Sequence, residues 1–131
     1  MTSRFTELVV NCSSPERLAS FWCEVLDFEV IDESEGKVEI GSWVPTVEDV
    51  RARQMSPTIV FVQVAEGKVV QNRLHLDVSP IDGSTEDEVA RLLGLGAVMV
   101  DVGQGPGRSW EVMADPEGNE FCVLRTLAPQ S

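Results

Sequence analysis

One order of segments occurs twice along this chain, and that repetition constrains the fold more than any other feature. An apolar, β-branched run at residues 5–12 precedes a helix signal, which is followed by strand-like segments at 28–31, 37–40 and 58–64. Residues 73–78 then precede a second helix signal, followed by strand-like segments at 97–102, 110–113 and 120–125. The order of the segments repeats although the amino-acid sequence does not. It predicts an α+β fold of paired βαβββ modules.

Capping residues mark where both helices begin. Ser13 or Ser14 is suited to cap the first helix, and apolar residues recur at helical spacing up to position 26. Thr85 with Glu88 predicts a capping box for the second helix, and either of two glycines, at positions 94 and 96, is suited to end it. Residues 115–119 (DPEGN) predict a turn. Residues 41–57 indicate either an exposed loop or a short helix.

Length and charge bound the function classes. The 131 residues predict one domain, with halves at about 4–65 and 71–127. Acidic residues number 22 against 10 basic ones, and the net charge of −12 disfavours nucleic acid and anionic membranes as partners. The apolar runs are too short to span a membrane, and the first residues lack a signal region, which favours the cytoplasm. Three irregularly spaced cysteines indicate reduced thiols.

Side chains alternate along a strand, so the sequence sorts them onto two faces. One face of each predicted strand is apolar, and an amphipathic helix is available to cover it. The other faces hold most of the polar chemistry, together with some apolar residues. This polar face is either an exposed side of a one-layer sheet or the lining of a cavity formed by a curled mixed sheet. Its candidate residues are Glu7, Phe61, Gln63, Arg73, His75, Asp77 and Cys122.

Three stretches together resemble the vicinal-oxygen-chelate superfamily, in particular its small glyoxalase-like bacterial members, a group that also includes bleomycin-resistance-like and dioxygenase-like proteins. They are residues 8–22 (LVVNCSSPERLASFW), 72–77 (NRLHLD) and 114–121 (ADPEGNEF). They occur in the superfamily's order and the resemblance covers nearly the whole chain. It implies two βαβββ modules around a shared small-molecule cavity, and a homodimer.

The resemblance also implies a metal site drawn from the first, fourth, fifth and eighth strands. The first-strand position falls on Glu7, where histidine or glutamine is common, and the fifth-strand position on His75. The last-strand position falls on Cys122, where glutamate is usual, and the fourth-strand position on Phe61 or Gln63. A carboxylate, an imidazole and a thiolate are competent ligands for zinc, iron, nickel, cobalt or manganese. No organic cofactor is implied.

Each of these residues also has a purely structural interpretation. Cys122 is then a small buried residue, and His75 is a hydrogen-bonded residue paired with Asp77 or Glu7. Arg73 either anchors a substrate carboxylate in a two-pronged contact or pairs with Asp77 in the wall of the cavity. Gln63, Phe61 and Asp77 are also candidates for substrate binding.

The leading hypothesis is a small-molecule enzyme, a metal-dependent lyase or isomerase acting on an oxygenated metabolite. Glu7 and His75 would then be ligands or acid–base groups. The alternative is a non-catalytic binding protein that sequesters a drug, and a third is a structural or regulatory partner domain. A ring-cleaving dioxygenase is disfavoured because the chain has one histidine. Glyoxalase activity is disfavoured because Cys122 stands where glutamate is usual.

Overall fold

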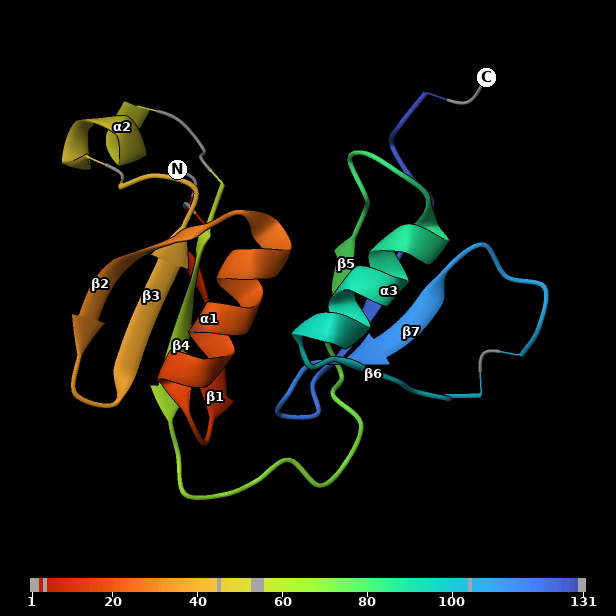
Figure 1. Ribbon diagram of the computed structural model, residues 1–131. Coiled ribbons are helices and arrows are strands. Elements are labelled where there is room, and N and C mark those ends of the chain that lie inside the picture. Colours follow the sequence, from red (N-terminus) through yellow and green to blue (C-terminus); the bar gives the residue numbers. More distant parts are fainter. Residues whose placement is uncertain (1–2, 4, 45, 53–55, 104, 130–131) are drawn as a thin grey trace. The chain divides into compact units, whose positions relative to one another are not determined.

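The chain divides into two compact units, residues 1–67 and 68–131, in a computed structural model that describes residues 3, 5–44, 46–52, 56–103 and 105–129 (Figure 1). In the first unit the order is β1 (Glu7–Cys12), α1 (Pro15–Leu26), β2 (Glu29–Ser34), β3 (Lys37–Gly41), α2 (Val47–Ala52) and β4 (Thr58–Gln63). In the second unit it is β5 (Leu76–Val78), α3 (Thr85–Leu95), β6 (Val98–Met99), β7 (Glu111–Ala114) and β8 (Glu120–Val123).

Each unit contains one four-stranded mixed sheet, and the two sheets have the same topology. The strand orders are β1-β4-β3-β2 and β5-β8-β7-β6. In each sheet the first strand pairs in parallel with the last strand of its unit, and the other pairings are antiparallel. The helix that follows the first strand packs on its own unit's sheet (Figure 1). The predicted α+β fold of repeated βαβββ modules is confirmed.

The first helix begins where its capping signal predicts. The side chain of Ser14 accepts a hydrogen bond from the backbone N–H of Arg17, and Pro15 occupies the first helical turn. The helix ends at Asp27, whose φ of 55° is left-handed and whose backbone N–H bonds the carbonyl of Cys23. In the segment 41–57, the short-helix alternative holds for Val47–Ala52, while positions 45 and 53–55 lie outside the described residues.

The second helix corrects the predicted capping box by one position. Ser84 is the N-cap: its hydroxyl accepts from the N–H of Asp87, and the Asp87 carboxylate accepts from the N–H of Ser84. The hydroxyl of Thr85 instead donates to the carbonyl of Leu124 at 3.0 Å. Serine at the N-cap and aspartate three residues later therefore form the box, because each side chain accepts a hydrogen bond from the backbone N–H of the other. Gly96, with φ of 114°, ends the helix.

Several strands of the second unit are shorter than predicted. The strand expected over 73–78 covers Leu76–Val78, and the one expected over 97–102 covers Val98–Met99. Both are edge strands of their sheet. An edge strand has one neighbour, so residues with strand propensity at its ends need not pair.

The core of each unit lies between its sheet and the helix that covers one face of that sheet. In the first unit, Leu18 of α1 is buried, as are Val38, Ile40, Ile59 and Phe61 on the sheet. The alternating register of β3 and β4 places these four sheet residues on one face. In the second unit the fully buried residues include Leu92, Met113, Phe121 and Val123. In the part of the chain that the structure describes, the longest apolar helical stretch falls short of a membrane span.

Candidate metal centre

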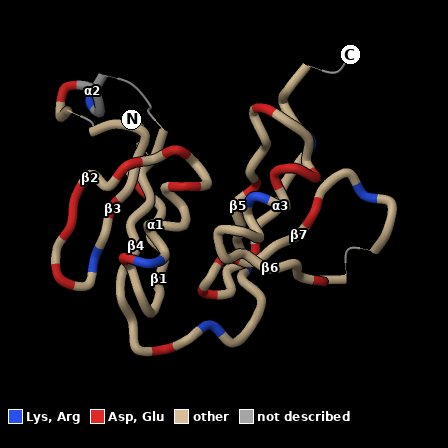
Figure 2. Tube along the Cα trace, in the orientation of Figure 1, with Lys and Arg blue, Asp and Glu red and all other residues tan. Residues whose placement is uncertain are grey.

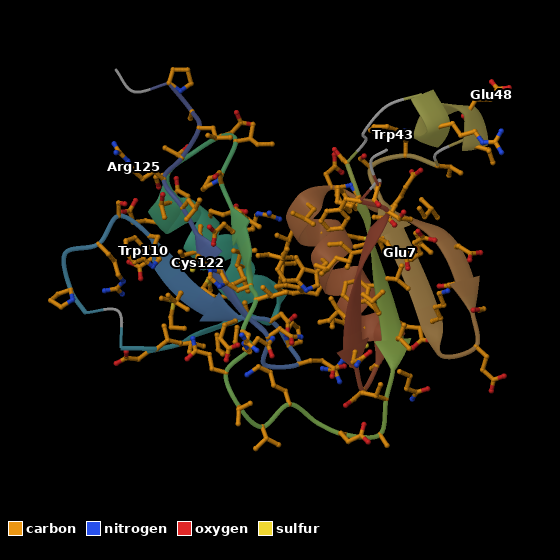
Figure 3. All side chains as sticks on the ribbon, turned by 180° about the vertical axis from the view of Figure 1, so that it is seen from behind. Glu7, Trp43, Glu48, Trp110, Cys122 and Arg125 are labelled. Carbon is orange, nitrogen blue, oxygen red and sulfur yellow. The ribbon has the colours of Figure 1, made fainter. Side chains whose placement is uncertain are left out.

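Two strands of the second unit bring Asp77 and Cys122 together. β5 and β8 pair in parallel, and Asp77 is the register partner of Cys122. Register partners in neighbouring strands place their side chains on the same face of a sheet. Their neighbours Leu76 and Phe121 point to the other face, where Phe121 is buried. The polar pair therefore occupies the face opposite the core, and Figure 3 labels Cys122.

His75 joins this pair from the residue just before β5. It stands two positions before Asp77, and the contact between the two side chains puts them on the same side of the chain. Nε2 of His75 lies 3.2 Å from Oδ1 of Asp77, and both side chains are about half exposed, at 48% and 50%. A nitrogen or oxygen of each and the sulfur of Cys122 all lie within 4.8 Å of one another. An imidazole, a carboxylate and a thiol thus converge on one point that solvent reaches.

The environment of Cys122 keeps its thiol protonated. Burial raises the pKa of Cys122, and the negative charge of Asp77 and a hydrogen bond to that carboxylate raise it further. The thiol is therefore a hydrogen-bond donor to Asp77 in the absence of a bound cation. Cys122 is partly buried as a residue, and it is the most buried of the three.

Replacing Asp77 by asparagine should make Cys122 several-fold more reactive towards iodoacetamide at pH 8, because removing the neighbouring charge lowers the pKa of the thiol and raises its thiolate fraction. Cys23 is the internal reference: burial and then the charges of Glu24 and Glu29 raise its pKa, and Asp77 contributes nothing to it. Peptide mass spectrometry over time would follow both thiols. Equal acceleration at both cysteines, or none at Cys122, would contradict the described coupling.

Glu7, the first-strand candidate, lies in the other unit. It belongs to β1, where its register partner is Thr58 of β4 (Figure 3). Thr58 is buried, and its hydroxyl donates to Oε2 of Glu39 at 2.6 Å. Glu39 pairs with Val60, and the alternation of β4 puts Val60 on the same face as Thr58. Glu7 thus shares its sheet face with a hydrogen-bonded threonine and glutamate.

The expectation that Phe61 and Gln63 share the face of Glu7 is wrong. Both stand an odd number of positions from Thr58, so they point to the face that α1 covers. Phe61 is 1% exposed and belongs to the core. Gln63 donates from Nε2 to the carbonyl of Ser13 at 3.2 Å, just before α1. The side chains of both residues therefore lie on the core face of the sheet and not on the face of Glu7.

Arg73 lies outside the strand to which the sequence assigned it. It is an exposed residue in a bend before β5, so the alternation of that strand does not fix its direction. The ion pair of Asp77 is with His75. Arg73 as a substrate anchor stays a prediction.

Sequence reasoning missed several polar residues near these faces. Glu39 could have been found, because Lys37 and Glu39 alternate with two buried apolar residues of β3. Glu120 precedes Cys122 by two positions and so shares its face, although the sequence alone indicates it only as the start of a strand. Its partners Lys68 and Asn72 lie about fifty positions away in the sequence. No local pattern predicts such pairs.

Comparisons with known proteins agree with the fold. The family model described as "Glyoxalase-like domain" matches residues 7–124. The fosfomycin resistance protein FosX from Mesorhizobium loti is 15% identical, with a TM-score of 0.64 over 97% of this chain and 96% of that one. A glyoxalase/bleomycin resistance protein/dioxygenase family enzyme from Burkholderia phytofirmans is 16% identical, with a TM-score of 0.62 over 92% and 97%.

A third solved structure is a variant of FosX from Listeria monocytogenes complexed with Mn(II) and 1S,2S-dihydroxypropylphosphonic acid. It is 14% identical, with a TM-score of 0.64 over 96% of this chain and 92% of that one. No curated protein matches the chain. At these identities the structures establish the fold, whereas the family model covers most of the sequence. The chain therefore belongs to the glyoxalase-like domain family.

Proposed function

We propose that this protein binds a divalent metal ion through His75, Asp77 and Cys122, and that the metal site serves lyase or isomerase chemistry on a small oxygenated molecule. The observation that carries the proposal is the convergence of these three side chains within 4.8 Å. Asp77 and Cys122 come from the adjacent strands β5 and β8, and His75 directly precedes β5, so folding of the second unit brings the three together. The FosX variant with bound Mn(II) supports a metal in this fold.

The donor set fits a metal ion. Four-coordinate zinc with bonds of about 2.1 Å separates its ligand atoms by about 3.4 Å, so ligand atoms that now lie up to 4.8 Å apart would have to move closer to bind it. The gap of 3.2 Å between His75 and Asp77 already fits. A thiolate and an imidazole favour zinc, iron, cobalt or nickel over manganese, which prefers oxygen ligands. Three protein ligands also leave a coordination position open for a substrate.

The residues themselves would perform distinct tasks. A metal ion at this point would act as a Lewis acid on a substrate oxygen. Before a metal binds, Asp77 would hold the His75 imidazole in place through their contact of 3.2 Å. The half-exposed imidazole and carboxylate leave the site open to a small molecule. The net charge of −12 repels polyanionic molecules, so a polyanionic substrate would need a cation bound at the site to anchor it.

Cobalt(II) titration of protein stripped of metal tests the ligand set. The wild type should take up one equivalent and develop a thiolate-to-cobalt charge-transfer band, which Cys122→Ser should abolish. His75→Ala should weaken binding by about 100-fold or more, because it removes a direct ligand. Cys23→Ser is the matched control, since Cys23 is a partly exposed thiol in the other unit, and its spectrum should equal the wild type.

Retention of the band and the affinity in Cys122→Ser would refute the proposed ligand set. Glu7 stays a prediction from the sequence, and Glu7→Gln in the same titration tests it. The loaded and stripped proteins would then be compared on vicinal-oxygen substrates such as 2-hydroxyketones and epoxides. Stoichiometric ligand capture without turnover or metal would instead support a sequestering protein. Sedimentation of the same samples would test the proposed homodimer.

A further inference from the structure

The segment that leads into β5 carries His75 yet lies outside the sheet. Residues 64–75 are all described and include neither helix nor strand. The parallel ladder between β5 and β8 starts only at Leu76 and Phe121. His75 therefore has no ladder hydrogen bond to hold it beside Cys122. Contacts besides the one between His75 and Asp77 have to fix this segment, since the unpaired end of a strand frays at little energetic cost.

Glu120 supplies that contact. Its Oε2 accepts from Nζ of Lys68 at 2.7 Å, and its Oε1 accepts from the backbone N–H of Asn72 at 3.2 Å. One carboxylate thus holds two points of the segment, the nearer of them three positions before His75. The side chains of Glu120 and Lys68 are 13% and 20% exposed, and their contact lies at the surface of the unit.

The turn between β7 and β8 completes the connection. Asn72 donates from Nδ2 to Oδ1 of Asn119 at 3.0 Å, and Asn119 is itself held by Asp115 at 3.0 Å and 3.2 Å. The stem of Lys68 passes over Gly118, where a Cβ would stand 4.0 Å from its Cδ. The segment before His75 is therefore fastened along the turn that precedes the strand of Cys122.

The carboxylate of Glu120 with its two partners, Lys68 and Asn72, forms a clamp, and this clamp lies beside the candidate metal site. If the register of β5 and β8 continued by one position, His75 would pair with Glu120. Glu120 lies two positions before Cys122, so its side chain is on the face of the candidate site. Both oxygens of its carboxylate are occupied by Lys68 and Asn72. The carboxylate therefore replaces the missing ladder contact at the position where the ladder stops.

We infer that Glu120 is a positioning residue, which holds His75 beside Asp77 and Cys122 by clamping Lys68 and Asn72. This inference goes beyond the proposed metal site and its metal-affinity part rests on that proposal. Hydrogen-bonded residues behind metal ligands commonly change affinity by about 10-fold to 100-fold when they are replaced. Loss of the clamp should therefore loosen the imidazole and weaken metal binding while leaving the fold intact.

The test compares Glu120→Gln with Glu88→Gln. Glu88 is a matched control, because its side chain is 16% exposed and it pairs with Arg91 at 2.8 Å on α3 of the same unit. The chain has one histidine, so its imidazole NMR signals report on His75 without ambiguity. In stripped protein, Asp77→Asn gives the reference spectrum for an imidazole that has lost its carboxylate partner.

Glu120→Gln should move the imidazole signals towards those of Asp77→Asn and lower cobalt affinity about 10-fold. Glu88→Gln should change neither, and circular dichroism should show all variants folded. Lys68→Met, which removes one partner of the clamp and leaves Glu120 in place, should shift the signals in the same direction. Should Glu120→Gln fail to fold, this second variant decides the matter.

Unchanged imidazole signals in Glu120→Gln would overturn the inference, whatever the affinity. An affinity within twofold of the wild type would overturn it even if the signals moved. A wild type that takes up no metal would refute the proposed function alone, because the signals of the stripped protein would still decide whether Glu120 positions His75.

Discussion

Phe121→Ala should lower the free energy of unfolding by about 3–5 kcal/mol, the range for removing a buried phenylalanine. Phe121 is 1% exposed, and its register partners are Leu76 on one side and Met113 on the other. Met113 and Leu92 of α3 are fully buried in the same unit. These neighbours belong to regular elements and cannot collapse into the space, so a cavity would remain.

Urea unfolding followed by circular dichroism measures this loss. Phe5→Ala is the matched control, because that ring is 59% exposed and its loss should cost below about 0.5 kcal/mol. Equal midpoints for Phe121→Ala and the wild type would contradict the packing described for β8. Phe121→Ala should also weaken the proposed metal binding, since β8 carries Cys122.

Asp115→Ala should cost about 2–4 kcal/mol, because one buried carboxylate organises the turn between β7 and β8. Asp115 is 3% exposed. Its Oδ1 accepts from the backbone N–H groups of Glu117 and Asn119 at 2.9 and 3.0 Å, and the side chain of Asn119 donates to both of its oxygens. Alanine would leave these donors without their acceptor in a partly buried turn.

Asp101→Ala is the control for this second variant. Oδ1 of Asp101 accepts from the N–H of Gly103 at 2.8 Å in an exposed turn, where water can replace it, so the expected loss is below about 0.5 kcal/mol. Asp115→Asn keeps one acceptor oxygen and should fall between the two. Thermal unfolding monitored by calorimetry would rank them, and a loss for Asp115→Ala no larger than for Asp101→Ala would rule out this role.

The elements of this fold are largely predictable from the sequence because their signals are local. Ser14 and Pro15 open α1 with residue types that satisfy or lack the free N–H groups of a helix start. Gly118, with φ of 87°, adopts the left-handed conformation that the turn at 115–119 was expected to need. The observed capping box lies one residue before the predicted one, because the adjacent hydroxyl residues Ser84 and Thr85 are nearly equal candidates for the N-cap.

The candidate site was only partly predictable, because it depends on register between strands. Alternation within a strand correctly grouped His75 with Asp77, and their contact confirms it. It could not tell which face of β4 lies on the side of Glu7: Ile59, Val60 and Phe61 are all buried, so the strand is apolar on both faces. For that reason, the sequence predicts the wrong sheet face for Phe61 and Gln63.

β2 forms one edge of its sheet, and its residues determine how that edge meets other molecules. Glu29, Asp32 and Glu33 are exposed along it, and the register shifts between Val30 and Asp32 (Figure 2). An incoming strand from a second copy would bring the same carboxylates against these and would meet an irregular ladder. Charge and irregularity at an edge both prevent strand addition. The acidity of this chain thus protects its first sheet from polymerising edge to edge while these carboxylates are ionised.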